Sequence, residues 1–205
     1  MVPDSIFSHM PRPFSSQFSK VIQDIAGLES FNVNVGMELL QQVPGSVLWL
    51  SKASNKAMEN LQKEAQARGV DPSRLVFATR VPARVDHLSR LRLADLFLDT
   101  PNYNAHATAA DALWAGVPVL TILGYTFAGR VAASQVSALG LPELIVHSTE
   151  EYKAKALELA QHPECLKGVK NRLEKNRYQT PLFNTKQYVK DLEGLYESLL
   201  KIRSS

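Results

Sequence analysis

Short apolar runs alternate with segments of helical spacing through most of this 205-residue chain. Each run is long enough for one strand, and the apolar residues between runs recur every three or four positions, as in a helix that packs one face on a core. This alternation predicts βαβ units, in which parallel strands are buried on both faces. We expect strands at residues 46–50, 75–78, 95–98, 117–123 and 143–146.

The expected helices connect these strands and then complete the chain. Gly69 follows the first of them, at a position where glycine commonly ends a helix. Right-handed crossovers make the fold a doubly wound, Rossmann-like α/β domain with a parallel sheet, whose ligands bind at the carboxyl ends of the strands. The helices are expected at residues 55–68, 83–91, 105–114, 127–139, 149–161, 163–177 and 184–202.

Residues 1–30 differ from the rest of the chain. Prolines stand there among several serines, and only residues 18–28 have a pattern that hints at a short helix. We interpret residues 1–30 as a leader or a remnant of something longer, and residues 31–205 as the folded domain.

The composition is that of an ordinary globular protein, with 45% hydrophobic and 21% charged residues. A formal net charge of +3 suits a small anionic ligand better than a nucleic-acid groove. No apolar run is long enough to cross a bilayer, and the N-terminus has no secretory signal, so no membrane partner is expected. Cys165 is the only cysteine, which excludes an intrachain disulfide and favours a cytoplasmic location, with a nuclear one as well in a eukaryote.

The loop after residue 98 carries the first group of candidate binding residues. Asn104 is expected to cap the next helix, and the small side chains that follow leave its first backbone N–H groups open to a phosphate. His106 and Thr108 add donors beside them, and Asp111 can accept hydrogen bonds from ribose hydroxyls or lock the loop. The alternative is that Asp111 is merely a favourable acid near a helix start and His106 a surface residue.

A second group, Arg80, Arg84, His87 and Arg90, follows residue 78. The last three recur at three-residue steps, so one helical face carries donors that suit a diphosphate or uracil carbonyls. The alternative is a solvated basic helix. Residues 124–130 form a further turn that can bind an anion, although they match neither a G-x-G-x-x-G fingerprint nor a P-loop. No histidines are spaced as metal ligands, so no metal is expected.

Several stretches in one order resemble the C-terminal catalytic half of the protein O-linked N-acetylglucosamine transferases, including their SPINDLY-like and bacterial members. The resemblance covers roughly residues 31–203, and the stretch Pro-Leu-Phe-Asn-Thr-Lys-Gln-Tyr near the C-terminus is one of the most specific. The stretches that carry it are residues 44–50, 92–100, 104–119, 130–135 and 181–188.

The resemblance implies the second half of a two-domain GT-B glycosyltransferase, with the active site between two Rossmann-like halves. It implies a UDP-N-acetylglucosamine donor, or GDP-fucose in some SPINDLY-type members, and a serine or threonine hydroxyl of a protein as acceptor. Transfer in this family inverts the anomeric centre and needs neither a metal nor another cofactor.

The resemblance also assigns positions in this nucleotide-sugar site. His87 and Arg90 match a histidine and an arginine near the nucleotide, and Arg84 stands where the animal enzymes have a lysine. His106, Thr108 and Asp111 match the family's run at the diphosphate and ribose. In that run Ala107 replaces a threonine, which removes one phosphate donor, and in a later turn Tyr125 replaces a common glutamate.

The largest departure lies upstream, where relatives have a Phe-Asn-x-x-x-Lys segment whose lysine neutralises the leaving diphosphate. Here Phe31 and Asn32 pass directly into residues 33–40, and no lysine follows at that spacing. Without it, transfer by this chain alone is not expected. Two alternatives therefore stay open: a catalytically inactive module that binds UDP or pairs with a missing N-terminal half, and another nucleotide-sugar enzyme on the same fold.

The last expected helix carries an apolar stripe at helical spacing, which is typical of a core or docking surface. We expect this helix to be structural, so that deletion of residues 189–205 exposes apolar surface and promotes aggregation. The stripe consists of Leu192, Leu195, Tyr196, Leu199 and Leu200.

Overall fold

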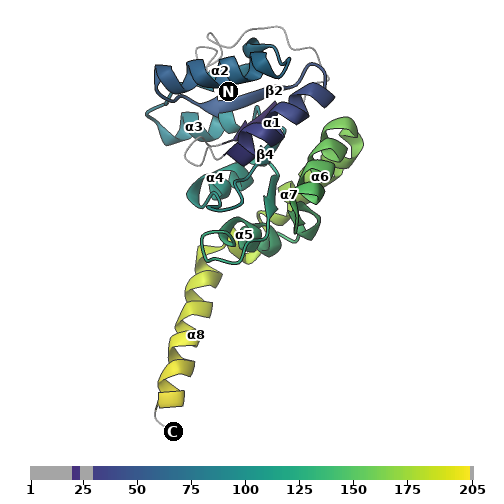
Figure 1. Cartoon of the computed structure of the whole chain (residues 1–205). Helices are drawn as coiled ribbons and strands as arrows, with labels where there is room; N and C mark the ends of the chain where they lie inside the picture. The colour runs from purple at the N-terminus through teal and green to yellow at the C-terminus, as the bar shows by residue number, and fades with distance from the viewer. Residues whose placement is uncertain (1–19, 24–29, 204–205) are drawn as a thin grey trace.

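A parallel sheet of six strands forms the centre of the domain (Figure 1). The computed structural model describes residues 20–23 and 30–203. The strand order is β3-β2-β1-β4-β5-β6. From β1 the chain adds β2 and then β3 on one side. It then returns to the other side of β1, where it adds β4, β5 and β6. This confirms the doubly wound α/β fold. The strands are β1 (Lys20–Gln23), β2 (Val47–Ser51), β3 (Leu75–Ala78), β4 (Leu96–Leu98), β5 (Val119–Ile122) and β6 (Ile145–Val146).

Helices connect the strands and cover both faces of the sheet. Right-handed crossovers put α1 and α2 on one face and α3, α4 and α5 on the other. Contacts agree with this division, since α3 packs on α4 and α4 on α5, while α6 returns to pack on α1. The helices are α1 (Ser30–Gln42), α2 (Asn55–Ala67), α3 (Arg84–Leu91), α4 (Ala107–Ala115), α5 (Val131–Ala138), α6 (Thr149–Gln161), α7 (Pro163–Asn176) and α8 (Thr185–Arg203), with short 3-10 turns η3 (Pro72–Arg74), η4 (Pro142–Leu144) and η5 (Pro181–Phe183).

The core lies on both sides of the central strands, because all the residues of β4 and nearly all of β2 are buried. Burial of both faces explains why these strands are continuous apolar runs rather than alternating ones. The largest fully buried side chains include Tyr152, Met37, Leu50, Leu113, Leu120, Leu139, Leu141, Leu144 and Leu173.

Strand β1 corrects the interpretation of residues 18–28. A helix was expected there, but Lys20–Gln23 is a strand that pairs with both β2 and β4 in the middle of the sheet. Most of the proposed leader, residues 1–19 and 24–29, lies outside the described residues. The division of the chain into residues 1–30 and 31–205 stays a prediction, but the sheet itself includes residues from the first part.

Two arginine side chains hold parts of the chain together away from the carboxyl ends of the strands. Arg74, in η3, donates hydrogen bonds to the carbonyl oxygens of Val43 and Ser46, which holds the turns before β2 and β3 together. Arg177 follows α7 and is 7% exposed. Its guanidinium donates to the carbonyl oxygen of Trp114 at 2.5 Å and so anchors the C-terminal end of α4.

Helix α8 projects away from the rest of the domain (Figure 1). The helix itself is confirmed, and its contacts with the domain are made with η5. Its apolar stripe is not part of the core, however, since Leu195, Leu199 and Leu200 are each more than 60% exposed. Of the two roles expected for the stripe, burial against the described residues is wrong, and the docking surface stays a prediction.

Candidate functional site

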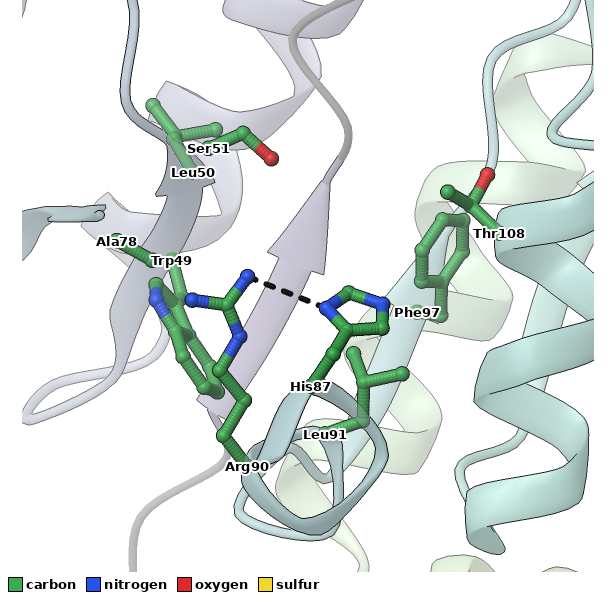
Figure 2. A pocket seen from close by; sticks show the side chains of 9 residues that line it. All are labelled: Trp49, Leu50, Ser51, Ala78, His87, Arg90, Leu91, Phe97 and Thr108. Carbon is green, nitrogen blue, oxygen red and sulfur yellow. Dashed lines mark hydrogen bonds between the residues drawn. The ribbon is translucent and has the colours of Figure 1, made fainter. Parts of the chain in front are cut away.

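A pocket opens near the carboxyl ends of β2 and β3, beside helix α3 (Figure 2). It is narrow, with a volume of about 40 Å³. A larger hollow of about 440 Å³ adjoins it and shares Ser51, Ala78 and Arg90 with it. The pocket is lined by Trp49, Leu50, Ser51, Ala78, His87, Arg90, Leu91, Phe97 and Thr108, and the hollow adds Lys52, Ala53 and Arg80.

Helix α3 supplies the polar wall of the pocket. His87 and Arg90 lie one turn apart, and the Arg90 guanidinium contacts His87 Nδ1 at 3.2 Å. Arg90 also donates to the carbonyl oxygen of Thr79, the residue after β3, at 2.5 Å. Burial lowers the pKa of the Arg90 guanidinium, because removal from water penalises its charge. The guanidinium is therefore held in place by the end of β3 and lies where an anion would compensate its lost hydration.

Asp111 lies in α4 and contacts two residues of α3. Its carboxylate accepts a hydrogen bond from Arg84 at 2.9 Å and lies 3.8 Å from His87 Nε2. Because His87 Nδ1 faces a guanidinium, which can only donate, the imidazole proton is assigned to Nε2, toward Asp111. Asp111 thus positions two of the expected nucleotide residues, which agrees more closely with a locking role than with a free acid at a helix start.

No side chain makes a capping hydrogen bond at the start of α4, and Asn104 does not cap it as expected. His106 occupies the N-cap position and makes no side-chain capping bond. Asn104 is fully buried; it accepts from the Ala132 N–H at 3.3 Å and donates to the Thr100 carbonyl at 2.9 Å. The expected cap is wrong because this amide ties the loop after β4 to the start of α5 instead.

His106 lies apart from the pocket that contains His87. Its imidazole stacks on Tyr103, with ring centroids 4.9 Å apart, and meets the edge of Phe127. Its Nε2 atom is buried and has no hydrogen-bond partner among the described residues. The structure therefore brings five expected residues into one connected group, Arg84, His87, Arg90, Thr108 and Asp111, and places His106 two residues before Thr108 in a second, aromatic setting.

A buried carboxylate holds the loop that leads into α4. Asp99, directly after β4, is 1% exposed and accepts hydrogen bonds from the Ala105 N–H and the Thr121 hydroxyl, both at 2.6 Å. Burial raises the pKa of Asp99 to about 6, and these hydrogen bonds oppose the rise. The hydroxyl of Tyr152 donates to the Asp99 carbonyl at 3.0 Å, and burial raises the pKa of this phenol well above its usual value.

The turn at residues 124–130 is closed by its own hydrogen bonds. The Gly124 N–H donates to the Gly129 carbonyl at 2.8 Å, and Arg130 donates back to the Gly124 carbonyl at 2.9 Å. A side chain at Gly124 would bring its Cβ within 2.8 Å of the Gly129 carbonyl oxygen. The glycine is therefore required by close backbone approach, which accounts for the turn without any ligand.

Several residues at the strand ends were not singled out from the sequence. Trp49 forms part of the pocket, Lys52 lines the hollow, and Asp99 holds the loop. Trp49, Lys52 and Asp99 lie at or next to the ends of β2 and β4, which is the available signal. What they contact depends on neighbouring strands, and no local pattern contains that information.

Within residues 20–23 and 30–203, no group of three or more histidine, cysteine, aspartate or glutamate side chains is placed to hold a metal ion. In the same part of the chain, no helix combines the length and apolar character that crossing a membrane requires.

Comparisons with known proteins agree with the fold and with the expected family. The sequence model of glycosyl transferase family 41 matches residues 24–192. Over 174 residues the chain is 37% identical to a UDP-N-acetylglucosamine--peptide N-acetylglucosaminyltransferase of Caenorhabditis elegans, an alignment that covers 85% of this chain and 15% of that protein. It is 39% identical to the probable UDP-N-acetylglucosamine--peptide N-acetylglucosaminyltransferase SEC of Arabidopsis thaliana, over 84% of this chain and 18% of that protein.

A solved structure is similar over the same region. A mutant of the Thermobaculum terrenum O-GlcNAc transferase matches with a TM-score of 0.75 and 26% identity, over 87% of this chain and 36% of that chain. The chain thus spans less than a fifth of the length of the two curated relatives and about a third of the solved one. Because the family model covers most of the sequence, the assignment does not depend on one short motif. The chain belongs to glycosyl transferase family 41.

Proposed function

We propose that this domain binds the UDP part of UDP-N-acetylglucosamine at the carboxyl edge of its sheet and takes part in transfer of N-acetylglucosamine to serine or threonine of proteins. The observation that carries the proposal is that His87, Arg90 and Thr108 line one pocket, while Asp111 links His87 to Arg84 beside it. The names of the relatives support the choice of donor and acceptor.

Charge around the hollow favours a diphosphate. Lys52, Arg80 and Arg90 line it, and its lining includes no acidic residue from the described part of the chain. Oxygen atoms of a diphosphate can accept from these cations and from the open N–H groups at the start of α4. In this arrangement Arg90 and His87 hold the nucleotide, and Asp111 keeps His87 and Arg84 in place or accepts from the ribose hydroxyls. His106 and Thr108 serve the diphosphate.

Transfer also requires that the leaving diphosphate be neutralised and that the acceptor hydroxyl be placed in line. The segment in which relatives carry the neutralising lysine corresponds here to the start of α1, and α1 contains no basic residue. Among the described residues, Lys52 and Arg80 are the cations of the hollow that could neutralise a leaving diphosphate instead. We therefore propose that the domain clamps the donor and that the acceptor-side groups are supplied by another half of a glycosyltransferase.

Titration calorimetry with UDP tests the proposal. The wild-type protein should bind UDP at millimolar concentration or below, and Arg90→Ala should weaken that binding. Lys190→Ala, in the exposed helix α8, removes a charge far from the pocket and is the matched control. Competition with GDP separates a UDP site from a GDP site. Absence of heat with millimolar UDP would rule out the proposed function.

An inactive UDP-binding module is the second candidate, and the lack of a basic residue in α1 favours it. The two candidates share the binding site and differ only in turnover. A cytoplasmic location is proposed for either one, because the only cysteine, Cys165, is exposed and free, which suits a reducing compartment.

A further inference from the structure

One buried donor in the pocket has no acceptor. Trp49 lies on β2 and is 4% exposed, and its indole Nε1 is buried with no hydrogen-bond partner among the described residues. The same side chain lines the narrow pocket together with Arg90 and His87 (Figure 2). Buried indole N–H groups normally find an acceptor, so a partner outside the described protein atoms is indicated.

No acceptor among the described residues lies within hydrogen-bond distance of the Trp49 indole nitrogen. Its sheet neighbours are Ile22 on β1 and Val76 on β3, and the pocket around it is mostly apolar, with Leu91 and Phe97 in its lining. The side chain of Val76 is apolar and cannot accept from the indole nitrogen. The indole is therefore held rigidly with its donor unsatisfied.

Arg90, a charged residue that lines the same pocket, cannot satisfy this donor. Arg90 has only donors, as does an indole, so the two side chains cannot bond to each other. Two possible acceptors beside Arg90 are already engaged by its guanidinium, the Thr79 carbonyl at 2.5 Å and His87 Nδ1 at 3.2 Å. The wall of the pocket thus presents donors, and a ligand with an acceptor oxygen complements it.

We propose that the indole N–H of Trp49 and the guanidinium of Arg90 together bind one acceptor oxygen of the nucleotide, which makes Trp49 a specificity-determining residue of the site. The inference rests on the proposed binding of UDP. The shared chemistry is an unprotonated oxygen, either a carbonyl of the pyrimidine or a phosphoryl oxygen. The narrow pocket admits such an oxygen at its base, while the remainder of the ligand occupies the adjoining hollow of about 440 Å³.

The test compares Trp49→Phe with Trp114→Phe in titrations with UDP, uridine and inorganic diphosphate. Phenylalanine keeps an apolar ring and removes the N–H. Loss of one hydrogen bond should raise the dissociation constant of UDP about 10-fold in Trp49→Phe. Trp114 packs on Phe183 and Tyr178 at the other end of α4, so Trp114→Phe should leave it unchanged. A matching loss with uridine assigns the oxygen to the base, and a loss with diphosphate assigns it to the phosphate.

Fluorescence keeps the inference testable if Trp49→Phe does not fold. The chain has two tryptophans, so Trp49 is the only indole emitter in the Trp114→Phe protein. Its emission should change when UDP is added. Unchanged emission, or equal UDP affinity in folded Trp49→Phe and wild type, would overturn the role of Trp49 while leaving UDP binding intact. If the wild type binds no UDP, the proposed function and this inference both fail.

Discussion

The carboxylate of Asp111, in α4, links this helix to Arg84 and His87 of α3. Replacing Asp111 with alanine should weaken UDP binding by roughly 1–3 kcal/mol, because His87 and Arg84 lose the charged partner that positions them. Calorimetry on the purified variant measures the change. Asp86→Ala, which removes an acid from the same helix α3 next to His87, should bind UDP as the wild type does. Equal losses in both variants would mean that general charge, and not the position of Asp111, matters.

Asp99 makes stability depend on pH in a direction opposite to that of most carboxylates. Its folded-state pKa of about 6 lies above the usual value of 3.8, so the native state binds the proton more tightly than the unfolded state does. Its contribution to the free energy of unfolding is therefore greatest below about pH 4. It falls as pH rises, by about 3 kcal/mol in total, and is lost above about pH 6.

Asp99→Asn should remove this dependence. An asparagine amide can accept from the Ala105 N–H and donate to Thr121, so the loop keeps its bonds without a charge. Urea unfolding of both proteins at several pH values between 4 and 7 should show the variant gaining stability relative to the wild type as pH rises. Parallel curves would show that Asp99 does not titrate in this window.

At the scale of elements, most helices and strands were predictable from the sequence, and the reason is physical. Parallel strands buried on both faces are uninterrupted apolar runs, so β2, β3 and β5 could be located within about two residues. β1 could not, because four residues of mixed polarity take their strand form from pairing with β2 and β4. α1 was not among the expected helices either, and its glycine and asparagines weaken the helical signal.

The turn between β5 and α5 should be intolerant of any side chain at Gly124. In Gly124→Ala the new Cβ meets the backbone of Gly129, which cannot move aside as a flexible side chain would. We expect a loss of roughly 1–3 kcal/mol of unfolding free energy, measured by chemical denaturation. The matched control is Gly168→Ala in α7, where a Cβ meets nothing and alanine should stabilise the helix by up to about 1 kcal/mol. Similar effects at both glycines would contradict the close-approach argument.

Helix α8 changes the expectation for a C-terminal truncation. Deleting residues 189–205 was expected to expose apolar surface, but the stripe on α8 is already exposed. The shortened protein should therefore fold, with a midpoint of thermal unfolding within about 2 °C of the full chain, and should associate less. Calorimetry and light scattering report the two quantities. Aggregation on truncation would show that α8 covers the domain in solution.

For the molecule as a whole, the expected outcome is binding without turnover. The chain spans 36% of the chain of the similar solved O-GlcNAc transferase, and its described residues offer a clamp for a nucleotide. Incubated alone with radiolabelled UDP-N-acetylglucosamine and a serine-rich peptide, the protein should transfer no measurable label. Turnover that disappears in Arg90→Ala would instead make this a minimal one-domain transferase.

The candidate site shows the limit of prediction from sequence at this largest scale. Spacing along α3 was enough to group Arg84, His87 and Arg90 on one face. It could not show that Asp111, from another helix, binds Arg84, nor that Trp49 would be left with an unsatisfied donor. Both facts arise where separate elements meet, after the whole sheet has formed. The functional assignment of individual residues therefore remains a prediction for binding experiments.

The anchoring of α4 by Arg177 has a consequence for the electric field at the opposite end of that helix. A helix carries partial positive charge at its N-terminus and partial negative charge at its C-terminus. The Arg177 guanidinium donates to the carbonyl of Trp114 and also pairs with Glu174, so the negative pole is bonded and fixed in place. No side chain makes a capping bond at the positive pole near Thr108. Because Arg177 fixes the direction of the helix axis, this uncapped positive end keeps one orientation toward an approaching anion.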